Sequence, residues 1–205
     1  VLSNASPDPT VGTWREEGRV AGLDLDSFSL DATSFEHRGR RYLIWAQRLP
    51  REQHNTALVM SEMASATALT GPEIVLTEPL LEWERRGHNV NEGAAVIKHA
   101  GRIFITYSAS ATDANYVMGL LWADEDADLL DPASWTKSQV PVFQSSEAGA
   151  RFGPGHNSFM QSEDGRDVLV YHARTYREIE GEPLNNPDRH TFLRVFTWGA
   201  DGFPV

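Results

Sequence analysis

The stretch EGAAVIKHAGRIFITY, residues 92–107, decides the fold class that the sequence predicts. It holds two short runs of apolar and β-branched residues with Gly101 between them. A run, a glycine turn and a second run that ends in an aromatic residue are typical of a β-hairpin. Similar runs recur along the chain, and only residues 124–130 favour a helix, which Asp131 and Pro132 would end. The sequence therefore predicts an all-β protein, with a sandwich, a barrel or a propeller as candidate architectures.

The hairpin pattern occurs three times, and this repetition favours the propeller. The repeats begin at Asp31, Glu92 and His156, and each has a glycine 8 or 9 residues later and an aromatic residue 14 or 15 residues later. The starts are 61 and 64 residues apart, a spacing compatible with propeller blades that carry long loops. Residues 56–60 and 117–122 are the expected outer strands between the repeats.

The repeat starts also predict a site. The first strand of every propeller blade lines the central channel, so we expect Asp31, Glu92 and His156 to face one cavity. Two carboxylates and an imidazole in one cavity can supply acid/base chemistry. A plainer interpretation stays open, because an aspartate at a strand start often caps backbone N–H groups and a histidine beside a glycine is often a hydrogen-bonded loop residue.

Composition excludes several other classes of protein. The 205 residues carry a formal net charge of -11, and the 18 Lys and Arg residues are scattered, so no basic face for nucleic acid is expected. There is no cysteine, which excludes disulfides and thiolate metal sites. No apolar run approaches the roughly 20 residues of a membrane-spanning helix, so no membrane partner is expected.

Seven short motifs follow one another along nearly the whole chain. They are SFSLDATSF (27–35), NVNEG (89–93), FITYSAS (104–110), DPASWTK (131–137), GPGHNSF (153–159), YHA (171–173) and WGADG (198–202). In this order and at this spacing they resemble glycoside hydrolase family 43, and specifically its arabinofuranosidase-like members. The resemblance implies a five-bladed β-propeller that hydrolyses arabinose-containing oligo- or polysaccharides with inversion. A β-xylosidase or an endo-arabinanase of the same family is the alternative activity.

The resemblance also implies a role for each repeat start. Glu92 matches the general acid that protonates the departing glycosidic oxygen, so its pKa should be raised. Asp31 matches the carboxylate that orients this acid and favours its protonated form. His156 matches a residue near the propeller axis that is often associated with calcium, commonly through water, since calcium prefers oxygen ligands.

The chain departs from the family pattern at its beginning. The general base of the family is an aspartate in the first blade, and neither it nor the following Trp-Ala-Pro-Glu motif is present. Asp8, Asp24 and Asp26 do not match the base motif. We therefore expect residues 1–205 to form the C-terminal three blades and a little more, with the remaining blades in a longer natural protein or in a second chain. The isolated chain is expected to be inactive, and a non-catalytic carbohydrate-binding propeller fragment is the alternative function.

Two further residues are candidates for substrate binding. Trp83, in the loop that leads to Glu92, offers a ring for stacking on a sugar, and core packing is an equally good interpretation. Arg194 lies where its fork of donors would reach a sugar hydroxyl. Pairing with a surface carboxylate is the interpretation we favour for Arg194.

Overall fold

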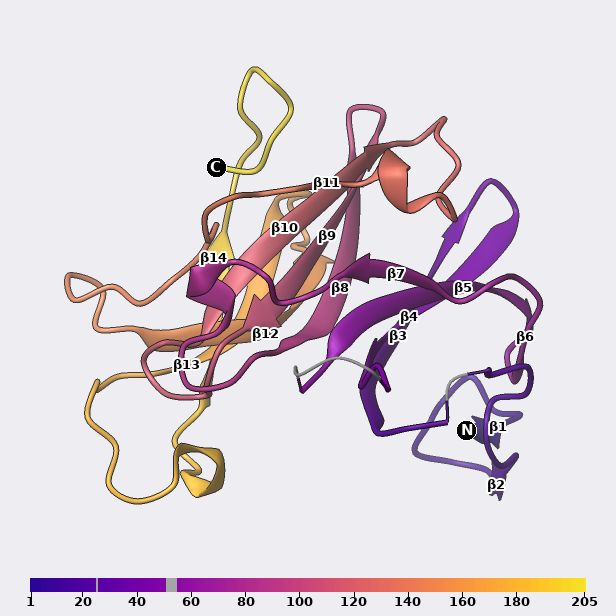
Figure 1. Cartoon of the computed structure of the whole chain (residues 1–205), viewed down its shortest axis with the longest axis horizontal. Coiled ribbons are helices and arrows are strands. Elements are labelled where there is room, and N and C mark those ends of the chain that lie inside the picture. The colour runs from indigo at the N-terminus through magenta and orange to yellow at the C-terminus, as the bar shows by residue number, and fades with distance from the viewer. Residues whose placement is uncertain (25, 51–54) are drawn as a thin grey trace.

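The computed structural model describes residues 1–24, 26–50 and 55–205 and shows an almost all-β chain (Figure 1). The first large sheet has the order β3-β4-β5-β6, with β7 paired to β5. Its strands are β3 (Ser29–His37), β4 (Arg40–Gln47), β5 (Ala57–Ser65), β6 (Ala68–Leu69) and β7 (Ile74–Thr77). A separate two-stranded hairpin, β1 (Leu2–Asn4) and β2 (Trp14–Glu16), precedes it.

The second and third large sheets repeat the same antiparallel meander. The second consists of β8 (Asn91–His99), β9 (Arg102–Ala109), β10 (Val117–Asp124) and β11 (Thr136–Lys137). The third consists of β12 (Phe152–Gln161), β13 (Asp167–Arg174) and β14 (His190–Val195). The predicted strands at residues 56–60 and 117–122 are confirmed as parts of β5 and β10.

Two-residue turns explain why the first two repeats fold as tight hairpins. Arg38 and Gly39 join β3 to β4 with φ values of 51° and 76°, and Ala100 and Gly101 join β8 to β9 with 47° and 77°. A turn with positive φ at both central residues matches the right-handed twist of the flanking strands. The glycine takes the second position without steric cost, which is why the sequence repeat is marked by a glycine.

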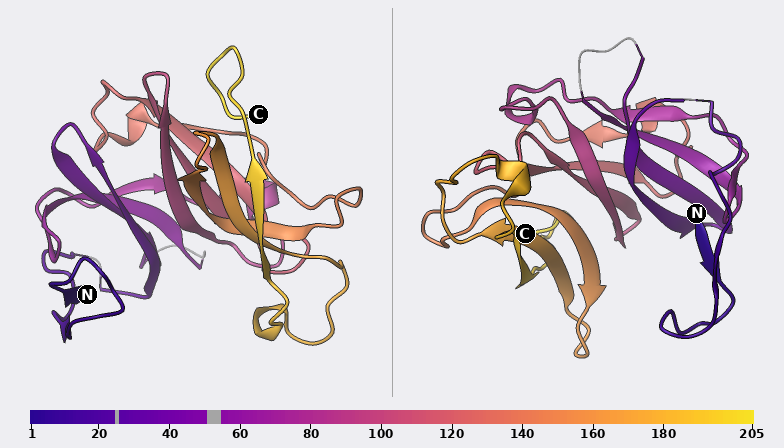
Figure 2. Two further views of the ribbon diagram at one scale, coloured as in Figure 1. Left: turned by 180° about the vertical axis from the view of Figure 1, so that it is seen from behind. Right: turned by 90° about the horizontal axis from the view of Figure 1, so that it is seen from below.

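The three sheets are arranged as successive propeller blades. The inner strand β8 contacts both β3 and β12, so the first strands of neighbouring blades lie side by side. Figure 2 shows the three blades as an open arc, with the first and third blades on either side of the second. The predicted all-β propeller architecture is confirmed.

Apolar side chains fill the space between adjacent blades. Between the first and second blades, Ile44 and Met60 pack with Ile103 and Ile105 in one buried cluster. Between the second and third blades, Met118 packs in a smaller cluster with residues of β13. Burying this apolar surface fixes the angle between the blades, and so the place where their inner strands meet.

The helix expected at residues 124–130 does not form. Asp124 ends β10, and residues 125–130 are turns. The Asp128 carboxylate accepts the backbone N–H of Leu130, and Trp135 donates its ring N–H to the carbonyl of Leu129, so local side-chain bonds replace the helical pattern. The described helices are three-residue 3₁₀ turns, η1 (Glu82–Glu84), η2 (Pro132–Ser134) and η3 (Pro183–Asn185). Within the described ranges, no helix has the length and apolar character to cross a membrane.

Candidate active site

Three ionisable side chains meet where the inner strands of the blades lie side by side. Asp31 belongs to β3, Glu92 to β8 and His156 to β12. One carboxylate oxygen of each acid and one ring nitrogen of His156 all lie within 4.8 Å of one another. The Nε2 of His156 is 3.8 Å from the Oδ1 of Asp31. The structure thus brings together the three residues that begin the sequence repeats.

A β-bulge at the same place in each inner strand aims these side chains. Two residues of the inner strand oppose one residue of the next strand, and the first bulged residue has a positive φ of 56° at Asp31, 58° at Gly93 and 48° at His156. Aspartate and histidine enter this left-handed region more readily than most residues. The equivalent positions are therefore Asp31, Gly93 and His156, which corrects the sequence alignment by one residue in the second blade. A Cβ at Gly93 would lie 3.1 Å from the His156 ring, so a larger residue would force the ring to shift and would also be strained at this positive φ.

The surroundings of Glu92 favour its protonated form. Burial is the main cause that raises the pKa of Glu92, and the nearby negative charge of Asp31 raises it further. A hydrogen bond from Tyr116 and the positive charges of His156 and Arg189 lower the pKa, but the net direction is upward. Glu92 therefore has the property that a general acid needs.

Tyr116, which the sequence reasoning missed, contacts Glu92 directly. Its hydroxyl donates a hydrogen bond of 2.7 Å to the Oε1 of Glu92, and its side chain is buried. The ring stacks on that of His172, with centroids 5.5 Å apart and planes 9° apart. A Cβ at Gly155 would lie 2.3 Å from the Tyr116 ring, so the glycine in the GPGHNSF motif was the one signal in the sequence that something packs there.

His172 packs against Tyr116 and has an unusual pKa. Burial lowers the pKa of His172 to about 4, and the positive charges of Arg189, His156 and Arg174 lower it as well. The imidazole is therefore neutral near pH 7. In the described part of the chain, neither of its ring nitrogens has a hydrogen-bond partner, and the same holds for the Oδ2 of Asp31. These orphaned polar atoms gather around the three-residue cluster, where a bound molecule or water would satisfy them.

Trp83 does not offer its ring to a sugar, which corrects the stacking expectation. The side chain is 8% exposed and belongs to the core between the first and second blades. Its ring packs against Tyr107, and its Nε1 donates a hydrogen bond of 3.0 Å to the carbonyl of Gln139. The alternative interpretation, core packing, is the one that the structure supports.

Arg194 lies away from the cluster, which corrects the other binding expectation. Strand β14 pairs His190 with Ala173, next to His172, whereas Arg194 pairs with Leu169 four residues farther along β13. That separation is roughly 13 Å at the rise of a β-strand. The guanidinium lies 5.5 Å from the ring centroid of Phe143.

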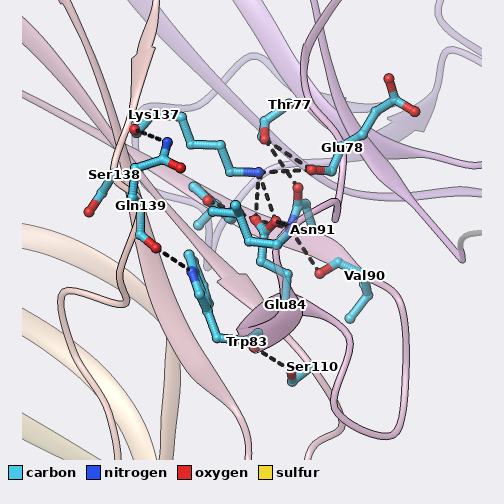
Figure 3. Close-up of polar contacts among 12 residues, drawn as sticks. Thr77, Glu78, Trp83, Glu84, Val90, Asn91, Ser110, Lys137, Ser138 and Gln139 are labelled. Atoms are coloured by element: carbon cyan, nitrogen blue, oxygen red, sulfur yellow. Dashed lines mark hydrogen bonds and ion pairs between the residues drawn. The ribbon is translucent and has the colours of Figure 1, made fainter.

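A second buried glutamate anchors the segment that leads to Glu92. Glu84, in η1, is fully buried and accepts hydrogen bonds from the side chains of Asn91, Tyr107 and Lys137 and from the backbone N–H of Leu81. Figure 3 shows Lys137 and Asn91 converging on its carboxylate. Because Asn91 directly precedes Glu92, this network fixes the start of the strand that carries the candidate acid.

The same residues can be compared with known proteins. A model of the family described as "Glycosyl hydrolases family 43" matches residues 1–204. The chain belongs to this family. An extracellular exo-alpha-(1->5)-L-arabinofuranosidase of Streptomyces avermitilis is 53% identical over 205 residues, which are 100% of this chain and 42% of that protein. An alpha-L-arabinofuranosidase 43 of Humicola insolens is 50% identical, and the match covers 100% of this chain and 43% of that protein.

A solved structure agrees with this family assignment. An alpha-L-arabinofuranosidase from Lactobacillus brevis superposes with a TM-score of 0.96 at 49% identity, over 99% of this chain and 63% of that one. This family 43 chain therefore spans about two fifths of the length of the curated relatives named above, and less than two thirds of the solved structure.

The donor set of the cluster limits how a cation would bind. Calcium takes six to eight oxygen ligands, and the cluster offers two carboxylates and an imidazole. A cation bound directly to Glu92 would also hold this carboxyl in its charged form, against the direction of its pKa. The residues fit a calcium ion that is held largely through water on the His156 side, and they do not fit one that protein atoms fully surround.

The distance between the two acids limits their chemistry. In an inverting glycosidase the acid and base carboxyl groups stand roughly 6.5–9.5 Å apart, which leaves room for a water molecule. The oxygens of Asp31 and Glu92 lie within 4.8 Å of each other. At this distance the charge of Asp31 raises the pKa of Glu92, and the separation is shorter than that of such an acid and base pair.

Proposed function

We propose that this chain is the acid-bearing part of an inverting α-L-arabinofuranosidase that releases arabinose from arabinan or arabinoxylan. The observation that carries the proposal is a partly buried glutamate with a raised pKa, held within 4.8 Å of an aspartate and a histidine at the meeting point of three blades. The relatives that are 50% and 53% identical are named as arabinofuranosidases, which favours cleavage of arabinofuranosidic bonds over cleavage of xylosidic bonds.

In the proposed reaction, Glu92 donates its proton to the glycosidic oxygen as the bond to the anomeric carbon breaks, and the bonding electron pair goes to that oxygen. Water adds to the anomeric carbon from the opposite face and gives its proton to the base. Asp31 favours the protonated form of Glu92 before the transfer through the repulsion of two like charges.

The base is proposed to come from residues outside these 205, in a longer natural protein or in a second chain. In the part of the chain that the structure describes, Asp31 is the only carboxylate in the cluster with Glu92. Asp8, Asp24 and Asp26 are exposed, and Asp26 forms an ion pair with Arg19. The isolated 205-residue chain is therefore expected to bind arabino-oligosaccharide without turnover. Hydrolysis of an aryl arabinofuranoside by the isolated chain would show that it holds its own base.

The role of Glu92 is tested by Glu92→Ala in the full-length protein. General acid catalysis contributes about 10²–10⁴-fold, so turnover of arabino-oligosaccharide should fall by that factor. Hydrolysis of 4-nitrophenyl arabinofuranoside should fall much less, because a good leaving group needs little protonation. Equal losses on both substrates would mean that Glu92 is not the general acid. A preference of the parent protein for the aryl xyloside over the aryl arabinofuranoside would point to a β-xylosidase.

A non-catalytic sugar-binding function is the second candidate, because the described cluster holds an acid without a base. Retained affinity for arabino-oligosaccharide without turnover in the full-length protein would favour it. Calcium near His156, held largely through water, stays a prediction that the partnerless Oδ2 of Asp31 supports.

A further inference from the structure

A path of polar contacts links the third blade to the candidate acid through the second blade. The backbone N–H of His156 donates a bond of 2.7 Å to the Oγ of Ser108, a fully buried residue of β9. Ser108 also lies near the Tyr116 hydroxyl and lowers the pKa of this phenol, against the larger effect of burial, which raises that pKa. The Tyr116 hydroxyl donates a bond of 2.7 Å to the Oε1 of Glu92.

The Tyr116 ring has little freedom to turn away from Glu92. It is 1% exposed and lies between the ring of His172 and the backbone of Gly155, where even an added methyl group would overlap it. A Cβ at Gly153 would lie 2.2 Å from the carbonyl of Asp113, so the loop that carries Tyr116 is also pressed against β12. Two glycines of β12, Gly153 and Gly155, therefore make room for this phenol and for the loop that carries it.

We propose that Tyr116 is a positioning residue that fixes which oxygen of Glu92 delivers the proton. Its hydroxyl occupies Oε1, so the acidic proton is carried by Oε2. When Oε2 has given its proton to the glycosidic oxygen, the same hydroxyl stabilises the carboxylate that remains. This proposal rests on the proposed function of Glu92 as the acid.

The charged groups that face Glu92 come from several elements. Asp31 approaches from β3, His156 from β12 and Arg189 from the segment before β14, and Tyr116 precedes β10. The hydrogen bond from Tyr116 lowers the pKa of Glu92, so its loss raises that pKa. The alkaline limb of the pH profile, which reports the deprotonation of the acid, should then move to higher pH.

The test is Tyr116→Phe in the full-length protein, with Tyr107→Phe as the matched control. Tyr107 donates the same kind of bond, 2.9 Å long, to the buried Glu84. Mispositioning of a reacting group costs up to about 10²-fold, so kcat/KM on arabino-oligosaccharide should fall about 10- to 100-fold in Tyr116→Phe. On 4-nitrophenyl arabinofuranoside it should change less than about threefold, and the alkaline limb should rise. Tyr107→Phe should leave the ratio of the two substrates and the limb unchanged.

Equal losses on both substrates, or an unchanged alkaline limb, would overturn the proposal and leave Tyr116 as a packing residue. If Tyr116→Phe fails to fold, the same comparison is made with Ser108→Ala, which removes a polar neighbour of the phenol and keeps the ring. It should show the same substrate dependence at smaller size, and equal losses on both substrates would overturn the proposal. Glu92→Ala distinguishes a failure of the acid assignment from a failure of the positioning role of Tyr116. If that variant shows no dependence on the leaving group, the assignment of the acid fails, whereas a dependence in Glu92→Ala without one in Tyr116→Phe refutes only the positioning role.

Discussion

Glu84, which is fully buried, and Glu92, which is partly buried, each accept a hydrogen bond from a tyrosine hydroxyl, but the charges and donors around them differ. Glu84 is paired with a cation, since the Nζ of Lys137 lies 2.7 Å from its Oε1. Tyr107, Asn91 and the backbone of Leu81 supply further donors to this carboxylate. Glu92 has one described donor, Tyr116, and its charged neighbours include a second carboxylate, Asp31.

Under the proposed function, one side-chain type serves structure at Glu84 and chemistry at Glu92. A buried carboxylate with a cation and several donors is held in its charged form and ties chain segments together. A buried carboxylate beside another carboxylate is pushed toward its protonated form and has a proton to give. The two sites are joined through Asn91, which bonds Glu84 and directly precedes Glu92. The structural site thus holds the chemical one in place.

The largest expected effect is a loss of stability in Glu84→Gln. The substitution leaves Lys137 without its countercharge in a half-buried site, where burial already lowers the pKa of the lysine. Breaking a buried pair costs about 3–5 kcal/mol, so the free energy of unfolding should fall by that amount in urea titrations. Lys137→Met in the same background should recover part of the loss, because it removes the unpaired charge. A loss below about 1 kcal/mol for Glu84→Gln would mean that the pair is solvated and that the contrast with Glu92 is wrong.

The sequence predicted those parts of the molecule that local patterns control. Apolar runs and the turn glycine Gly101 placed the hairpins, and the recurrence of the pattern placed the three strand starts together. The alignment was one residue out at Glu92, because it matched ionisable residues, whereas the bulge position of this strand is occupied by Gly93. The helix expected at residues 124–130 does not form, because the Asp128 side chain hydrogen-bonds the nearby backbone of Leu130 instead.

The sequence did not predict the positions of residues that depend on contacts between strands or between blades. Trp83 precedes Glu84 and looked available to a sugar, but packing between two blades buries it. Arg194 was placed by counting along a strand whose register with β13 was unknown. Tyr116 belongs to no motif, and it reaches Glu92 because β9 pairs with both β8 and β10 and so brings the start of β10 near the start of β8.

A smaller effect on stability, of opposite sign, is expected from Glu92→Gln, the same chemical change at the other glutamate. The folded-state pKa of Glu92 is raised, so the folded protein binds this proton more tightly than the unfolded one. Stability is therefore lost as pH rises from the unfolded pKa, about 4.3, through the folded pKa. Glutamine removes that loss, so the variant should melt above the parent at pH 7 and with it at pH 4. A lower melting temperature at pH 7 would mean that the hydrogen bonds of Glu92 stabilise the fold by more than its buried charge destabilises it.

The smallest of these effects is a shift in the pH profile, which is expected for Asp31→Asn. The negative charge of Asp31 raises the pKa of Glu92, so its removal lowers that pKa. The alkaline limb of kcat/KM in the full-length protein should then move to lower pH, opposite to the shift expected for Tyr116→Phe. The two substitutions act on the same carboxyl from β3 and from the loop before β10, so in the double variant the shifts should oppose each other. A limb that does not move in Asp31→Asn would mean that the two carboxylates are uncoupled. What separates Glu92 from Glu84 would then be the missing cation alone, with no contribution from Asp31.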